Sequence, residues 1–135
     1  MVARGVRNNN PTNIRKGDNW DGLSTKQTDD SFCVFDDVKF GIRAFCKLIL
    51  NYKKFYSIDT INGIVNRFAP SSENDTRSYV EHLCLRLGKK EDESLDLYNS
   101  EVMLELVKAV IKHECGSIPY SDTEIKAGMA LAGIS

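Results

Sequence analysis

The chain has 135 residues, of which 41% are hydrophobic and 27% charged, and its 18 basic and 19 acidic residues give a formal net charge of −1 at pH 7. This length fits one domain with a substantial core, and the composition is that of an ordinary globular protein. The balanced charge argues against binding to the phosphate backbone of nucleic acid, and no apolar stretch approaches the roughly 20 residues that a membrane span needs.

The first predicted unit spans residues 4–35, which are rich in Asn, Asp, Gly and Thr and lack helical periodicity. Short β-prone pieces, TNI and SFCVF, flank turn-rich stretches such as KGDNWDG and KQTDDS. This pattern favours a small irregular sheet or hairpin. We therefore expect a β lobe at the front of the domain.

The remaining residues, 36–135, show helical patterns separated by short polar connectors. Helices are predicted over residues 38–56, 60–69, 77–88, 100–114 and 125–133. Asp36 or Asp37 caps the first of them, and the SDTE sequence at 121–124 is a capping box for the last. The expected fold class is α+β and predominantly helical, with one domain over residues 1–135.

The helix predicted over residues 100–114 ends in the acidic residue that we consider the best catalytic candidate. At about 100° per residue, Glu114 lies about 20° from Met103, within the apolar face that also holds Val107 and Val110. Ionisation there is opposed by burial and by the negative end of the helix dipole, so we expect this carboxyl to keep its proton closer to neutral pH than an exposed glutamate does. Such a group suits general-acid cleavage of a glycosidic bond. The alternative is a frayed helix end with Glu114 in water.

The asparagine-rich stretch RNNNPTNIRKGDNWDG, residues 7–22, is unlike a core sequence. Asparagine offers an uncharged donor and acceptor, which suits an N-acetylated sugar polymer, and a tryptophan can stack on a sugar ring. The alternative is structural, because asparagines also form Asx-turns and cap nearby backbone. The predicted substrate-binding residues are Asn8, Asn9, Asn10, Trp20, Tyr79 and Tyr120. For Tyr79, which lies on an apolar row, core packing is the alternative.

Four segments of the chain resemble a family of bacteriophage virion and lysis proteins that are described as lysozyme-like or transglycosylase-like. They are RGVRNNNPTNIRKGDNWDGL, FCVFDDVKFGIRA, RFAPSSENDTRSYV and IKHECGSIPY, and the resemblance covers roughly residues 4–132. Cys115 departs from the family pattern, in which Asn follows the Glu. The segments are also similar to the glucosaminidase and flagellar-type muramidase branch of the lysozyme superfamily, in a circularly permuted order.

The resemblance implies a lysozyme-like domain that cleaves the glycan strand of peptidoglycan, with Glu114 as the catalytic acid. Candidates for a second carboxylate are Asp21, Asp29 and Asp30 in the front lobe and Glu73 after the second long helix, and we predict Asp21 and Glu73 as catalytic. The distance between the two carboxylates distinguishes inversion from retention, whereas a lytic transglycosylase needs no second carboxylate.

No metal or cofactor is expected, because His82 and His113 show no ligand spacing and the four cysteines form no C-x-x-C pattern. The N-terminus has no hydrophobic signal region, so we expect synthesis in the cytoplasm. Action at the cell wall or periplasm would then follow delivery by a virion, a holin-type pore or a secretion machine. The alternative function is a non-catalytic virion structural or cell-wall-binding protein with the same fold.

Overall fold

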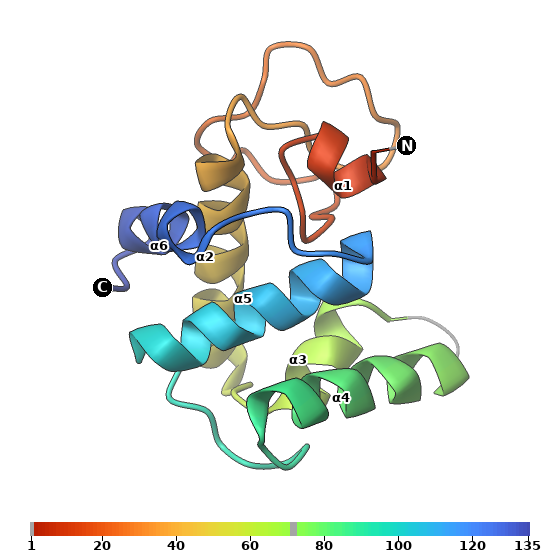
Figure 1. Cartoon of the computed structure of the whole chain (residues 1–135), viewed down its shortest axis with the longest axis vertical. Helices are drawn as coiled ribbons and strands as arrows, with labels where there is room; N and C mark the ends of the chain where they lie inside the picture. Colours follow the sequence, from red (N-terminus) through yellow and green to blue (C-terminus); the bar gives the residue numbers. More distant parts are fainter. Residues whose placement is uncertain (1, 71–72) are drawn as a thin grey trace.

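The computed structural model describes residues 2–70 and 73–135, and for residues 73 and 74 only the backbone. The described part of the chain is predominantly helical (Figure 1). Its helices are α1 (Arg4–Arg7), α2 (Val38–Tyr56), α3 (Ile61–Phe68), α4 (Glu73–Leu87), α5 (Ser100–Cys115) and α6 (Asp122–Leu131). Among them, none is both long and apolar enough to cross a membrane.

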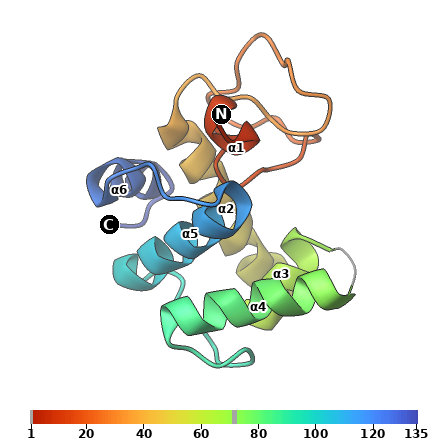
Figure 2. The same cartoon turned by 45° about the vertical axis from the view of Figure 1, so that its right-hand side comes forward.

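The segment from residue 8 to residue 37 forms an irregular lobe that lies beside α1 (Figures 1 and 2). Its β structure is limited to isolated antiparallel bridges, one between Arg15 and Phe32 and one between Leu23 and Phe35. The sheet that we expected in this region is therefore reduced to single bridges, and a short helix occupies its beginning.

Inside this lobe, side chains make hydrogen bonds to backbone groups in place of a regular ladder of backbone hydrogen bonds between strands. The Asn10 side chain donates hydrogen bonds to the carbonyl oxygens of Ile14 and Cys33, at 3.0 and 2.9 Å. Its own carbonyl oxygen accepts from the backbone N–H of Ile14 at 2.9 Å. Because buried backbone groups need partners, one asparagine here satisfies groups that a strand would otherwise pair.

Helix α5 crosses the centre of the molecule and contacts α1, α2, α4 and α6 (Figures 1 and 2). Its buried residues are Met103, Leu104, Leu106, Val107, Ala109, Val110 and Ile111. The apolar face predicted from Met103, Val107 and Val110 is thus confirmed as the core face. Asn99 caps the start of α5, and Gly116, in the left-handed conformation at φ 81°, ends it.

Two glycines let α2 approach its neighbours closely. A methyl group at Gly128 of α6 would lie 2.6 Å from Cβ of Ile42, so a side chain there would force α6 away from α2. A methyl group at Gly41 would collide with the backbone carbonyl oxygen of Asn9. Helix α2 is therefore packed tightly against both α6 and the N-terminal lobe.

Two helices begin several residues before their predicted starts. Helix α6 begins at the capping box itself, where Ser121 accepts from the backbone N–H of Glu124 at 3.2 Å, three residues before the apolar pattern. Helix α4 begins at Glu73, in a polar stretch that we expected to be a loop. Polar first turns carry no apolar periodicity, so the pattern alone places such helix starts too late.

Candidate functional site

Glu114 lies half-buried in the last turn of α5, where this helix meets α1 and the N-terminal lobe (Figure 1). Its Oε1 accepts a hydrogen bond of 2.9 Å from Nδ2 of Asn13, which is 101 residues away in the sequence. The helix continues to Cys115 before Gly116 ends it. The end of α5 is therefore ordered, and its carboxylate faces protein rather than standing free in solvent.

Asn13 borders the candidate site through its contact with Glu114, although its sequence context does not distinguish it from the neighbouring asparagines. Its backbone has a φ of 56°, in the left-handed region that asparagine tolerates better than most residues. Its Oδ1 is buried without a hydrogen-bond partner and faces Gly5, where a methyl group would approach it to 2.9 Å. The available signal was the position of Asn13 within the same NNNPTN motif as the predicted asparagines.

The aromatic ring of Tyr79, in α4, lies beside Glu114. Tyr79 is only 5% exposed and stacks on His113, with ring centroids 3.7 Å apart. Its hydroxyl approaches the Glu114 carboxylate without a hydrogen bond of good geometry. Burial, and then the negative charge of Glu114, raise the pKa of Tyr79 well above its ordinary value. Tyr79 thus packs in the core and also borders the candidate site.

His113 also contacts a second histidine on the neighbouring helix. Its Nδ1 lies 3.2 Å from Nδ1 of His82 in α4. Burial lowers the pKa of both imidazoles, and for His82 the positive charges of His113, Arg86 and Lys112 lower it further. The negative charge of Glu114 partly offsets this effect by raising the pKa of His113. At neutral pH the pair is therefore uncharged and can share one N–H···N hydrogen bond.

A pocket of about 220 Å³ begins at Asn13 and is walled by aromatic rings from three parts of the fold. It is lined by Asn13, Ile14, Arg15, Lys16, Asp18, Trp20, Leu48, Tyr52 and Phe68. Trp20 comes from the N-terminal lobe, Tyr52 from α2 and Phe68 from α3. The predicted sugar-stacking residue Trp20 therefore shares a pocket with the residue that holds Glu114.

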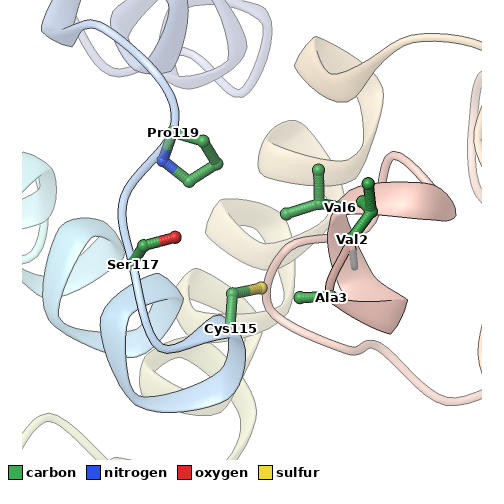
Figure 3. Close-up of a pocket in the computed structure, with 6 residues that line it drawn as sticks. All are labelled: Val2, Ala3, Val6, Cys115, Ser117 and Pro119. Carbon is green, nitrogen blue, oxygen red and sulfur yellow. The ribbon is translucent and has the colours of Figure 1, made fainter.

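A second pocket, of about 460 Å³, lies between α1 and the segment that follows α5 (Figure 3). It is lined by Val2, Ala3, Val6, Cys115, Ser117 and Pro119. The sulfur of Cys115 is directed towards α1 and donates to the carbonyl oxygen of Pro11 at 3.2 Å. Burial raises the pKa of the Cys115 thiol to about 11, so it remains protonated near neutral pH.

The three consecutive asparagines, which we expected to bind substrate, have their amides engaged within the protein. Asn8 is 3% exposed and donates to Oδ2 of Asp29 at 3.0 Å, and Asn9 donates to the carbonyl oxygen of Phe35 at 3.0 Å. Asn10 is completely buried. These contacts support the structural alternative, in which the asparagines build the lobe that carries Asn13 and Trp20.

The candidate second carboxylates occupy different surroundings. Asp29 is buried and held by two 2.6 Å hydrogen bonds from Arg4, which together with backbone N–H groups keep the pKa of Asp29 far below its ordinary range. Asp21 is 72% exposed and pairs with Arg43 at 3.2 Å. Glu73 begins α4, and its side chain lies outside the described residues. The carboxylate of Asp29 is thus used in hydrogen bonds within the lobe, whereas the carboxylate of Asp21 is exposed to solvent.

Tyr120 lies half-buried between α5 and α6, packed against the core. Its hydroxyl is buried without a hydrogen-bond partner, and burial raises the pKa of Tyr120 to about 12. All four cysteines are free thiols. Across the ranges that the structure describes, no three His, Cys, Asp or Glu side chains gather in a way that could hold a metal ion.

No protein-family model matches the chain. Over 131 residues, however, it is 37% identical to Protein P5 of Pseudoalteromonas phage PM2, in an alignment that spans 94% of this chain and 80% of that protein. A relative of this similarity, aligned over nearly the whole chain, establishes common ancestry. The chain therefore belongs to the family of the bacteriophage protein P5.

Proposed function

We propose that this protein is a peptidoglycan-degrading glycosidase with a lysozyme-like fold, in which the N-terminal lobe and the helical lobe flank the glycan strand. The observation that carries the proposal is the contact between Glu114 at the end of α5 and Asn13 in the lobe, beside a pocket with aromatic walls. A carboxyl group at such a junction suits protonation of a glycosidic oxygen, and aromatic rings suit the faces of sugars.

In this proposal Glu114 donates its proton to the bridging oxygen as the glycosidic bond breaks. Glu114 is half-buried beside Tyr79, so one side of the carboxyl group is shielded from water. If the reaction is a hydrolysis, we propose Asp21, an exposed carboxylate of the lobe, as the group that activates water. If it is a lytic transglycosylation, the 6-hydroxyl of the sugar closes the ring and no second carboxylate is needed.

The phage origin of the relative supports a route to the cell wall. Protein P5 is a phage protein, and its name states no activity or ligand. We propose that this chain reaches peptidoglycan in a virion, through a holin-type pore or by a secretion machine. Peptidoglycan glycan strands are then its partners at the bacterial wall.

Purified sacculi test the proposal, with mass spectrometry of the released fragments. Wild-type protein should release muropeptides whose reducing or anhydro ends identify the cleaved bond and the reaction type. Glu114→Gln keeps the shape of the side chain but removes the acid, so the release rate should fall about 100-fold or more. Glu105→Gln, on an outer face of the same helix, is the matched control and should retain the wild-type rate. Release that is unaffected by Glu114→Gln would contradict the proposal.

A second candidate function is a non-catalytic virion or wall-binding protein that keeps this fold. The observation that favours it is Cys115, which stands where the resembling family has Asn and holds its sulfur against Pro11. Such a protein would sediment with purified sacculi and release no fragments. The same experiment therefore separates the two functions.

A further inference from the structure

We infer that Asn13 is a positioning residue for Glu114: its side-chain amide selects which carboxyl oxygen carries the reactive proton. The inference rests on the proposed function, since it assigns a role within that same site. It starts from the 2.9 Å hydrogen bond between Nδ2 of Asn13 and Oε1 of Glu114.

The direction of this hydrogen bond fixes the chemistry of the two oxygens. An amide N–H can only donate, so Oε1 of Glu114 must accept. In a protonated carboxyl group the proton sits on the other oxygen when the first one accepts such a bond. Oε2 is therefore the oxygen that delivers the proton to the bridging oxygen of the glycan, and Oε1 stays bonded to Asn13 as the carboxylate forms.

The side of the amide away from Glu114 is enclosed by protein and makes no hydrogen bond. Oδ1 of Asn13 is buried and faces the α-carbon of Gly5, where any side chain would displace it. The backbone N–H of Asn13 donates to the carbonyl oxygen of Asn10 at 2.9 Å, so the turn is tied to the most buried asparagine of the lobe. The donor is thus presented to Glu114 from a turn that is hydrogen-bonded within the lobe.

The backbone of Asn13 provides a second, independent observation. Its φ of 56° lies where glycine is the least strained residue. A turn that needed only this conformation would be served at least as well by glycine, which cannot donate a side-chain hydrogen bond. Strained backbone conformations cluster at functional sites. Asparagine at this position thus adds a side-chain donor that the turn itself does not require.

The variant Asn13→Gly separates the role of the turn from the role of the side-chain amide. It keeps the left-handed turn and removes only the amide. We expect kcat for glycan release to fall about 100-fold, KM to change by less than about 3-fold and the thermal unfolding midpoint to stay close to that of the wild type. Ser57→Gly is the matched control: Ser57 has a φ of 57° at the exposed end of α2, and its replacement should leave kcat unchanged.

Asn13→Asp adds a pH readout that tests whether the side chain of residue 13 contacts Glu114 in solution. A second carboxylate against Glu114 opposes ionisation of the acid, so the alkaline limb of the pH–rate profile should shift to higher pH. Full kcat in Asn13→Gly, or an unshifted profile in Asn13→Asp, would overturn the inference while leaving the proposed function intact. An inactive wild-type protein would instead overturn the proposed function, and the positioning role with it.

Discussion

The ring of Tyr79 lies nearly flat against the imidazole of His113, with 20° between the two planes. The two residues come from α4 and α5, so the stack joins these helices one residue before Glu114. Because the pKa of Tyr79 is raised well above its ordinary value, the hydroxyl stays protonated and uncharged at physiological pH. The helical side of the candidate site is thus a neutral aromatic wall.

Removing the Tyr79 hydroxyl should not weaken the protein. Tyr79→Phe keeps the stack and deletes a buried oxygen without a hydrogen-bond partner, so the free energy of unfolding should stay the same or rise by about 1 kcal/mol. Tyr79→Ala also deletes the ring and should cost about 3 kcal/mol. Urea unfolding measures both. A clear loss of stability in Tyr79→Phe would mean that the hydroxyl is bonded to Glu114 in solution.

Acidification should weaken the packing of α4 against α5. The pKa values of His82 and His113 are lower in the folded protein than the value of about 6.5 in an unfolded chain. The unfolded state therefore binds more protons below about pH 6.5, and the stability contributed by the neutral pair is complete above that pH and lost below it.

Urea unfolding at pH 7.5 and at pH 5.5 tests the contribution of the pair. The free energy of unfolding should be smaller at the lower pH, and His82→Gln should reduce the difference because one titrating group and its repulsion with His113 are removed. The charged groups around the pair are Arg86 and Lys112, which disfavour protonation of His82, and Glu114, which favours protonation of His113. An identical pH dependence in His82→Gln would contradict the assignment.

The ion pair between Arg4 and Asp29 should hold the N-terminal lobe at neutral pH. Asp29→Asn leaves Arg4 without its carboxylate and places an amide where backbone N–H groups of Ser31 and Phe32 donate, so the thermal midpoint should fall. The pKa of Asp29 is depressed in the folded state, so its contribution is complete above the unfolded value of about 3.9 and is lost at lower pH.

The matched control for this lobe is the neighbouring exposed acid. Asp30→Asn should change the free energy of unfolding by no more than about 0.5 kcal/mol at pH 7. Differential scanning calorimetry at pH 7 compares the two variants directly. Equal midpoints for Asp29→Asn and Asp30→Asn would show that the buried pair contributes nothing to the lobe.

A methyl group at Gly5 in α1 should disturb the candidate site by displacing Asn13. It would lie 2.8 Å from the carbonyl oxygen of Asn10, 2.9 Å from Oδ1 of Asn13 and 3.2 Å from the sulfur of Cys115. Gly5→Ala should therefore cost about 1–3 kcal/mol of stability by overpacking, and it should also slow glycan release by displacing the amide that contacts Glu114. Unfolding and release assays on the same preparation measure both effects. Wild-type values in both would contradict the packing described for α1.

The sequence predicts most of the helical lobe because its signals are local. The apolar face of α5, the caps at Asp37 and Ser121 and the end of α5 at Gly116 each depend on residues within one or two turns of each other. The short helix α1 contains four residues, too few for any periodic pattern, so it was missed.

The candidate site was only partly predictable for the same reason. The helical pattern predicts Glu114 as a candidate residue, and the residue type within a turn-rich stretch predicts Trp20. The contact of Glu114 with Asn13 joins residues 101 positions apart, and no local pattern encodes it. Which asparagine of the motif faces the acid depends on left-handed turns and on the close approach at Gly5, and these are set by tertiary packing.

The hydrogen bond between Asn13 and Glu114 also has a consequence for biosynthesis. Asn13 leaves the ribosome 101 residues before Glu114, so their contact cannot form on a nascent chain until the last turn of α5 has emerged. Products of premature termination carry the whole N-terminal lobe but lack the acid.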